Sequence, residues 1–344
     1  MSPRDLAERD FRENRSFAEA PPTRLLVSLT ERCNLRCVHC ITDAPRRTQE
    51  GTARAMTEEV LDALTPGLNE IEYVGLTHAG EPTAAPLLER FLDRLRLGKQ
   101  RPATVHVVTN GKQLDVARFS RLAKLGVRSF CFSMDGLSEA SHDAIRIGGS
   151  FAALDQTLRE LAQVRRQHFS HVRLGVSFTL TALNVREAPR LPEYARAVGL
   201  DYVKLEELVP LGGLVAPEDL ADTVKLTIAS GRLARIPVLD HTIDPPFECQ
   251  LDSEDARTRS ELDDFANHVA INACRLPFEQ LCIEPNGDVR PVDFHQPIAG
   301  NVLDSSLLEI WNSPRLILER NRRRLTRPCR TAQPTCPPDP EAAE

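Results

Sequence analysis

Long apolar runs, aromatic side chains and an excess of positive charge are all scarce in this chain of 344 residues. The N-terminal segment contains no apolar run of signal-peptide length. No later segment approaches the roughly 18 apolar residues of a membrane-spanning helix. These absences argue against a membrane protein and predict a soluble protein of the cytoplasm.

The chain has no excess of positive charge, since it contains 43 lysines and arginines and 49 acidic residues and has a formal net charge of −6. A phosphate-backbone partner therefore has no general electrostatic support. The one dense basic run, residues 320–327, has no aromatic side chains interleaved with it, and aromatic residues are only 5% of the chain. We interpret this run as a solvated helix end and expect no nucleic-acid partner.

Cysteine, in contrast, is plentiful. The chain has nine cysteines. A chain of this length forms a stable hydrophobic core without disulfide bonds. In a reducing cytoplasm, cysteines in such number are more often metal ligands or reactive thiols than disulfides. The cysteines therefore indicate chemistry rather than stabilisation.

A repeat of short apolar run, turn and amphipathic helix begins near residue 24. Strands that alternate with helices favour parallel βα units with right-handed crossovers. Six such units fall short of the eight of a full barrel, so the sequence predicts an α/β fold, a partial (β/α)6 barrel of TIM type with a small C-terminal extension. The six predicted strands are residues 24–30, 71–77, 104–110, 127–134, 172–180 and 201–208.

This pattern also predicts where the parts of the chain begin and end. In the last part, Asn286, Gly287 and Asp288 predict a hairpin between two short strands. Helices are expected near residues 218–235 and within 307–323. The predicted parts are an N-terminal tail (1–23), the partial barrel (24–208), a bridging region (209–273), and a C-terminal module with its tail (274–344).

Three cysteines follow the first predicted strand, in the sequence TERCNLRCVHC. Cys33, Cys37 and Cys40 are thereby placed on a loop at the carboxyl end of a barrel strand. Three thiolates so close together can hold three irons of a 4Fe–4S cluster, and they leave the fourth iron open to a small chelating molecule. The alternative is zinc, which normally has four ligands. His39 would then be the fourth ligand, although it lies awkwardly between two of the cysteines.

This cysteine spacing after a first barrel strand resembles that of the radical S-adenosylmethionine (SAM) enzymes. The resemblance implies that SAM binds the open iron and that an external one-electron reductant, of flavodoxin or ferredoxin type, reduces the cluster. It also implies that a 5′-deoxyadenosyl radical removes a hydrogen atom from an unactivated carbon of the substrate.

The same resemblance implies contacts with SAM after the later strands. Gly80, Glu81 and Pro82 occupy the place of the family's Gly-Gly-Glu-Pro stretch, with Ala79 replacing the first glycine. Ser133 and Asp135 resemble positions that face the methionyl carboxylate and the ribose. For the serine, the aspartate and the asparagine, ordinary turn and cap chemistry is an equal alternative. The residues are Gly80, Glu81, Pro82, Ser133, Asp135 and Asn184.

Four more cysteines lie in residues 274–344, and four is the ligand number of a complete 4Fe–4S cluster. The sequence between them resembles the SPASM/twitch extensions of many radical SAM enzymes. That pattern has a cysteine five residues after the hairpin glycine, where this chain has Val292. Zinc is the alternative, with Asp293 and His295 as substitute ligands. The resemblance implies one auxiliary 4Fe–4S cluster, held by Cys274, Cys282, Cys329 and Cys336.

Two cysteines remain outside both sets. Cys131 lies within a predicted strand, where alternation places it opposite Phe130 and Phe132, and we interpret it as a small packing residue. Cys249 follows two prolines between the barrel and the extension, where a loop is able to close over the barrel mouth. Because an S–H bond is weaker than a C–H bond, its thiol is a candidate hydrogen donor to a substrate radical. Inert packing and ligation of the auxiliary cluster are the alternatives.

Acidic residues surround Cys249. Residues 240–264 hold nine acids and two arginines, a net charge of −7, and Glu206 and Glu207 end the sixth predicted strand. Such charge suits a polycationic aminosugar or polyamine, although a solvated acidic helix gives the same pattern. Together with the isolated cysteine, these features resemble the radical epimerases of aminoglycoside biosynthesis. The resemblance implies inversion of one ring carbon, with Cys249 as the catalytic thiol.

Three other functions fit parts of the sequence. A twitch-type dehydrogenase of an aminocyclitol alcohol would need no thiol donor. A peptide-modifying maturase is less well supported, because few residues precede the first strand. Outside these enzymes, an iron–sulfur redox or electron-transfer protein would use the clusters without cleaving SAM.

Overall fold

The computed structural model describes residues 2–13, 15–97, 103–208, 219–241 and 275–323. All six predicted strands are confirmed within these ranges. The strands are β1 (Arg24–Val27), β2 (Arg36–Cys37), β3 (Tyr73–Leu76), β4 (Thr104–Thr109), β5 (Val127–Ser133), β6 (Arg146–Ile147), β7 (Arg173–Leu180), β8 (Tyr202–Glu207), β9 (Val238–His241), β10 (Gln280–Ile283), β11 (Asp288–Pro291) and β12 (Gly300–Asn301).

One large sheet of ten strands contains all six of the predicted barrel strands. Its strand order is β12-β11-β10-β1-β3-β4-β5-β7-β8-β9. From β10 to β9 every neighbouring pair is parallel. The strands β11 and β12 run antiparallel to their neighbours, and β2 pairs with β6 apart from the sheet. Parallel strands place their carboxyl ends at one edge, where sites form in α/β folds. The predicted α/β fold with a mostly parallel sheet is confirmed.

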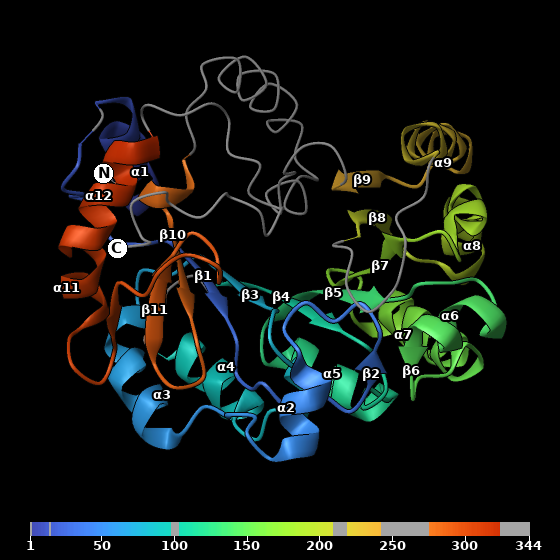
Figure 1. Ribbon diagram of the computed structural model, residues 1–344, viewed down its shortest axis with the longest axis horizontal. Coiled ribbons are helices and arrows are strands. Elements are labelled where there is room, and N and C mark those ends of the chain that lie inside the picture. The colour runs from blue at the N-terminus through green and yellow to red at the C-terminus, as the bar shows by residue number, and fades with distance from the viewer. Residues whose placement is uncertain (1, 14, 98–102, 209–218, 242–274, 324–344) are drawn as a thin grey trace.

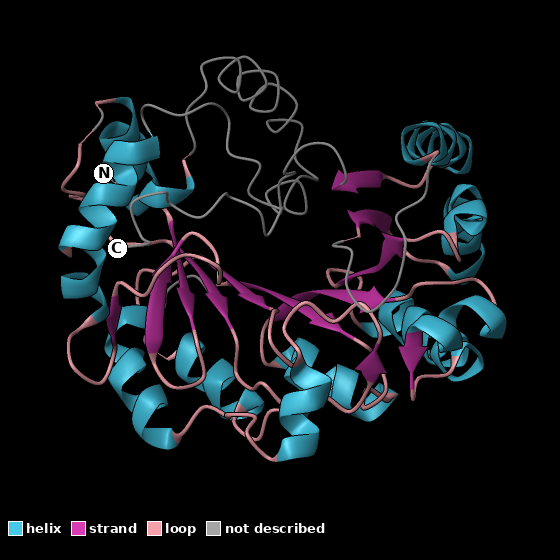
Figure 2. Cartoon of the chain, in the orientation of Figure 1, coloured by secondary structure: helices cyan, strands magenta, loops and turns pink. Residues whose placement is uncertain are grey.

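The helices follow the outer side of the curved sheet (Figures 1 and 2). Side chains of Thr57, Asp115 and Ser150 cap three of them by accepting backbone N–H groups. No helix in the described ranges is long and apolar enough to cross a membrane. The helices are α1 (Pro3–Arg12), α2 (Ala44–Glu50), α3 (Glu58–Leu64), α4 (Leu88–Arg96), α5 (Val116–Lys124), α6 (Glu139–Ile145), α7 (Phe151–His168), α8 (Leu191–Val198), α9 (Leu220–Ala234), α11 (Leu307–Trp311) and α12 (Pro314–Arg323), with 3-10 turns η1 (Thr65–Leu68), η2 (Pro82–Ala84), η3 (Val185–Arg190) and η5 (Leu276–Phe278).

The two faces of the sheet differ in polarity. On the outer face, Phe130 and Phe132 of β5 join the apolar core under the helices. On the inner face, Cys131 is buried and hydrogen-bonded to Tyr202. Gly175 makes room for this tyrosine, since a Cβ there would stand 2.3 Å from the Tyr202 ring. The predicted alternation along β5 is confirmed, and Cys131 is buried on a side of the strand that also carries the hydroxyls of Ser129 and Tyr202.

The C-terminal module is built onto the first strand of the barrel. Strand β10 lies parallel to β1, and the predicted hairpin connects β10 to β11 through Gly287, whose φ of 88° is left-handed. The predicted helical segment becomes α11 and α12. Buried Arg320 of α12 donates hydrogen bonds to the carbonyls of Ser16 and Trp311. The segment predicted as an N-terminal tail therefore contains α1 and packs against the C-terminal helices.

Candidate functional site

The three N-terminal cysteines lie on one loop at the carboxyl end of β1. Cys33, Cys37 and Cys40 are each partly exposed, and none forms a disulfide. Cys37 belongs to β2, which pairs with β6, and the backbone N–H of Cys40 donates to the Cys37 carbonyl at 3.3 Å. The loop is thus held from both sides of the cysteine motif.

Hydrogen-bond donors from other elements point at the sulfur atoms. Asn110 Nδ2, just after β4, lies 3.9 Å from Cys33 Sγ. Arg146 Nη1 of β6 lies 3.7 Å from Cys37 Sγ. The hydroxyl oxygen of Thr42 lies 3.4 Å from Cys40 Sγ, but its proton is donated to the Ala79 carbonyl, so it is not a donor to this sulfur. Donors such as Asn110 and Arg146 stabilise thiolate ligands and adjust the potential of an iron–sulfur cluster.

The thiols themselves are partly desolvated. Burial raises the pKa of Cys33 to about 11, and burial raises the pKa of Cys37 despite the opposing charge of Arg146. Without metal these thiols are therefore protonated at neutral pH. Binding of iron would convert them to thiolates with release of protons.

The arrangement of donors fits a cluster better than a single ion. Among the described residues, no three His, Cys, Asp or Glu side chains converge where one metal ion would be held. His39, the fourth ligand of the zinc alternative, instead lies with Nε2 at 3.3 Å from Asp135 Oδ2. A 4Fe–4S cluster gives each thiolate an iron of its own and needs no such convergence. Cys33, Cys37 and Cys40 therefore fit the cluster.

The segment after β3 approaches the cysteine loop closely. A Cβ on Gly80 would stand 2.4 Å from the carbonyl oxygen of Arg32, so only glycine fits there. The backbone N–H of Glu81 donates to that same carbonyl at 2.9 Å, and the Thr42 hydroxyl donates to the Ala79 carbonyl at 2.8 Å. This part of the predicted SAM-binding stretch is thereby fixed against the cysteine loop.

The carboxylate of Glu81 is buried and already has four donors. Its Oε1 accepts the N–H and the hydroxyl of Thr83 at 3.0 and 2.6 Å and the hydroxyl of Thr109 at 2.7 Å. Its Oε2 accepts the N–H of Asn110 at 2.8 Å. Pro82 starts the short turn η2 beside it. Glu81 therefore ties the end of β3 to the end of β4, and its contact with a methionyl ammonium stays a prediction.

Asp135, beyond the end of β5, is the centre of a second buried network. Its Oδ2 lies 2.7 Å from Arg146 Nε, and its Oδ1 accepts the N–H of Thr179 at 2.8 Å. Burial lowers the pKa of His39, although the charge of Asp135 opposes this. Arg146 thus joins Asp135 to the sulfur of Cys37. The sequence did not reveal Arg146, because it lies 109 positions from Cys37.

The other two predicted SAM contacts lie at the same edge of the sheet. Ser133 ends β5, partly exposed, directly before Met134 and Asp135. Asn184 is buried, and its Nδ2 donates to the carbonyls of Asp135 and Thr179 at 3.1 and 2.8 Å. Both amide N–H groups are thereby used in joining β5 to β7. The cofactor contacts of Ser133, Asp135 and Asn184 stay predictions.

The predicted auxiliary site is described only in part. Cys282 is fully buried in β10, in register with Leu26 of β1. Its role as a ligand stays a prediction. Glu206, predicted at the barrel mouth, pairs with Lys204 at 2.6 Å. Four predicted residues lie outside the described ranges: Cys249, Cys274, Cys329 and Cys336.

The turn after β11 carries backbone strain. Val292, which stands where the SPASM pattern has a cysteine, has a φ of 61°, and Asp293 N donates to the Pro291 carbonyl at 2.6 Å across it. A β-branched residue rarely adopts this left-handed conformation. Phe294 then stacks on His78 with ring centroids 4.0 Å apart and an interplanar angle of 3°. His78 directly precedes Ala79 and Gly80, so this turn contacts the predicted SAM-binding stretch.

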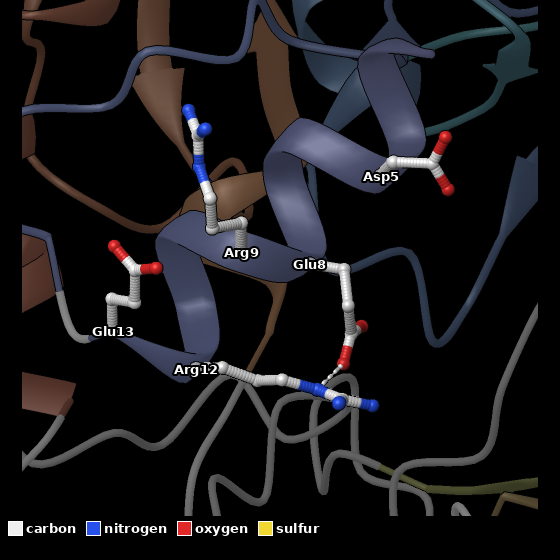
Figure 3. Close-up of a pocket in the computed structure, with 5 residues that line it drawn as sticks. All are labelled: Asp5, Glu8, Arg9, Arg12 and Glu13. Carbon is white, nitrogen blue, oxygen red and sulfur yellow. Dashed lines mark hydrogen bonds and ion pairs between the residues drawn. The ribbon is translucent and has the colours of Figure 1, made fainter. Parts of the chain in front are cut away.

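Figure 3 shows a hollow on helix α1 that is separate from this site. Arg12 and Glu8 form an ion pair there, and none of the cysteine-loop residues lines it. Exposed pairs of this kind contribute little energy, so we assign no ligand to the hollow. Its lining residues are Asp5, Glu8, Arg9, Arg12 and Glu13.

Two family models match the chain. The model of the radical SAM superfamily matches residues 27–179, and the SPASM model, an iron–sulfur cluster-binding domain, matches residues 274–337. Together they include the cysteine loop and the described hairpin of β10 and β11.

Curated relatives are similar over different shares of the chain. A cofactor-modifying protein of tungsten-containing aldehyde ferredoxin oxidoreductase from Pyrococcus furiosus is 30% identical over 58% of this chain, which spans 54% of that relative. Mycofactocin maturase MftC of Mycobacterium tuberculosis is 27% identical over 87% of this chain and 72% of its own length. PqqA peptide cyclase of Streptomyces rochei is 27% identical over 91% of this chain and 82% of its own length.

Solved structures have the same fold at low identity. Streptococcus suis SuiB bound to the precursor peptide SuiA superposes with a TM-score of 0.63 at 13% identity, covering 93% of this chain and 70% of SuiB. The structure of anSMEcpe with bound AdoMet and Kp18Cys peptide gives a TM-score of 0.64 at 18% identity, covering 89% and 84%. At these identities the likeness supports the fold alone.

Proposed function

We propose that this chain, which carries a radical SAM domain followed by a SPASM domain, is an epimerase that removes one hydrogen atom from a substrate carbon and returns another from the opposite face. When bound, a reduced cluster of this kind supplies one electron to SAM, and the resulting chemistry is removal of hydrogen from an unactivated carbon. The observation that carries the proposal is the cysteine loop beside Gly80, with side-chain donors of Asn110 and Arg146 directed at two of its sulfurs.

The residues of the chain have separate tasks in this proposal. Cys33, Cys37 and Cys40 hold the cluster, and Asn110 and Arg146 stabilise two of their thiolates. Gly80 lets the backbone that precedes Glu81 lie against the cysteine loop. Asp135 holds the guanidinium of Arg146 beside Cys37. One auxiliary 4Fe–4S cluster would be held by the ligand set Cys274, Cys282, Cys329 and Cys336.

Cys249 is the proposed hydrogen donor. Its S–H bond breaks as a C–H bond forms on the face opposite to the abstraction, which inverts the carbon and leaves a sulfur-centred radical. One electron from the external reductant and one proton then restore the thiol. This assignment is supported by the cysteine count, since both predicted ligand sets are complete without Cys249.

The proposed substrate is a polycationic aminosugar, as in conversion of neomycin C to neomycin B. The acidic stretch around Cys249 supports it, because nine acids within residues 240–264 would attract ammonium groups. Glu206 and Glu207 at the end of β8 add carboxylates at the edge of the sheet where barrel substrates bind.

Modification of a peptide is a second candidate. A relative whose name states a peptide substrate, PqqA peptide cyclase, is similar over 91% of this chain, and a relative named as a maturase is similar over 87%. A cyclase joins two positions of a peptide and removes two hydrogen atoms, so its product is lighter than the substrate. An epimer has the same mass as its substrate.

Incubation in heavy water distinguishes these functions. The reconstituted protein, SAM and a reductant are incubated with neomycin-type aminosugars, and products are analysed by mass spectrometry and NMR. Epimerisation through a thiol whose hydrogen exchanges with solvent places one deuterium on a single inverted ring carbon. A ketone product without deuterium, or a peptide product two hydrogens lighter, would contradict the epimerase.

The donor assignment is tested by Cys249→Ala. We expect this variant to cleave SAM to 5′-deoxyadenosine but to release no inverted product. The matched control is Cys131→Ala, a cysteine outside both predicted ligand sets and hydrogen-bonded to Tyr202 on the inner face. If Cys249→Ala still epimerises at the wild-type rate, the thiol is not the donor.

A further inference from the structure

We propose that an exposed basic patch beside the cysteine loop docks an acidic one-electron donor protein of flavodoxin type. The patch consists of Arg36, Lys112 and Ile147. The inference rests on the proposed function, because an enzyme of that kind has to be reduced at its cysteine loop. It adds the surface through which the reductant arrives.

Contacts between neighbouring residues make the patch continuous. Arg36 of β2 is in register with Ile147 of β6 across an antiparallel pair. The ammonium of Lys112 donates to the carbonyl of Gly148, the residue after Ile147, at 2.8 Å. Arg36 and Lys112 are exposed, and Ile147 between them is 38% exposed, so the patch has an apolar side chain between two cations.

Each member of the patch stands close to a group that contacts a cysteine sulfur. Arg36 precedes Cys37 in the chain. Ile147 follows Arg146, whose guanidinium lies 3.7 Å from Cys37 Sγ. The backbone N–H of Lys112 donates to Asn110 Oδ1 at 3.0 Å, and the Nδ2 of the same side chain lies 3.9 Å from Cys33 Sγ. A protein seated on the patch would therefore lie against the cysteine loop, which shortens the path of an electron.

The charge of the patch selects an acidic partner. Neither Arg36 nor Lys112 forms an ion pair with any residue in the described ranges. Further along the loop Arg32 and Ile41 are exposed next to Cys33 and Cys40. The chain as a whole carries a net charge of −6, so a basic surface with an apolar centre differs from the average surface. Opposite charges speed a short-lived encounter, and redox partners form small interfaces.

The electron balance is simple. The donor protein loses one electron, and the cluster held by Cys33, Cys37 and Cys40 gains it. No bond forms between the two proteins, so docking affects how often an encounter is productive rather than the later chemistry. A small reductant such as dithionite does not need the patch.

This difference between reductants gives the test. We would measure 5′-deoxyadenosine formation by the reconstituted full chain with dithionite and, separately, with a reduced flavodoxin of net negative charge. For Arg36→Glu combined with Lys112→Glu, we expect the KM for flavodoxin to rise about tenfold or more, with an unchanged dithionite rate. Raising the salt concentration should increase the KM of the wild type more than that of the variant.

Controls separate charge from structural damage. Arg36→Lys keeps the charge and should keep the wild-type KM. Arg232→Glu reverses an exposed charge on α9, away from the cysteine loop, and should change nothing. An unchanged flavodoxin KM in the double variant would overturn the proposal, as would an equal loss of rate with both reductants.

Failure of the proposed function would look different. A wild-type protein that loads its clusters but forms no 5′-deoxyadenosine even with dithionite would contradict radical SAM chemistry. Docking is still measured in that case by calorimetric binding of the flavodoxin. Equal affinity of wild type and double variant would then reject the patch.

Discussion

Two buried carboxylates, Glu31 and Asp135, form ion pairs next to the cysteine loop, and their surroundings differ. The cations that pair with Glu31, Arg47 and Arg54, are 39% and 40% exposed. The partners of Asp135, Arg146 and His39, are only 11% and 12% exposed. Water screens the first group and hardly reaches the second. The same kind of ion pair is therefore expected to contribute very different energies.

The two carboxylates also connect to different parts of the molecule. Arg54 joins Glu31 to Glu284 of the C-terminal module at 3.0 Å, and Glu284 accepts from Arg290 at 2.5 Å. Asp135 connects the ends of β5 and β7 and, through Arg146, reaches a cysteine sulfur. The Glu31 side thus joins two modules of the fold, whereas the Asp135 side lies within the site.

Asp135→Asn should have the largest effect on stability. It leaves the guanidinium of Arg146 buried without a counter-charge, which costs about 3–5 kcal/mol. Urea unfolding at pH 7, followed by circular dichroism, measures this loss. The control Asp222→Asn removes an acid from an exposed pair and should change stability by less than about 0.5 kcal/mol. A loss below 1 kcal/mol for Asp135→Asn would show that the two carboxylates do not differ as proposed.

Glu31→Gln should cost less, about 1–3 kcal/mol, because water still solvates Arg47 and Arg54. Burial alone would raise the pKa of Glu31, but hydrogen bonds from Arg54 outweigh it and lower the pKa below its usual 4.5. A carboxyl with a lowered pKa stabilises the fold above the pKa of the unfolded chain, and this contribution is lost as the pH falls below it. The gap between wild type and variant should therefore be full at pH 7 and shrink below about pH 4.5.

His78 should give a smaller effect in a different pH range. Burial, assisted by His295 and Arg290, lowers its pKa to about 3. Below the ordinary histidine pKa, near pH 6.5, the unfolded chain takes up a proton that the folded chain does not. As the pH is lowered below that value, the free energy of unfolding therefore falls by up to about 1.4 kcal/mol per pH unit.

His78→Asn should remove that slope between pH 6.5 and 5, since asparagine tolerates the positive φ of this position and does not titrate. Unfolding free energies of both proteins across this range measure the difference. Equal slopes would mean that His78 is accessible to protons. The stacked pair of His78 and Phe294 would then not differ in solvent access from the ion pairs of Glu31.

Local patterns predicted much of the fold and the position of the site. The alternation of six strands with helices was sufficient to predict the α/β fold. The spacing of Cys33, Cys37 and Cys40 was sufficient to predict the cysteine loop, and Gly287 predicted the hairpin. Each of these signals is contained within a few consecutive residues.

The remainder depends on pairings between distant residues. No local pattern indicates that Arg146 contacts Cys37, or that β10 extends the sheet beside β1. The polar inner face that holds Cys131 follows from the phenol of Tyr202, which belongs to another strand. The role of Asn184 depends on two distant carbonyls, that of Thr179 in β7 and that of Asp135 just beyond β5. Contacts of this kind become visible only once the chain is folded.

The pairing of β1 with β10 has a consequence for how the protein is made. Arg24 and Gln280 are neighbours in the sheet although 256 positions separate them. A growing chain emerges from the ribosome with its metal-binding loop first, while one edge of β1 stays open until β10 has been synthesised. An open strand edge is a template for pairing with other chains. A chain truncated before residue 280 would keep Cys33, Cys37 and Cys40 and still be prone to aggregate.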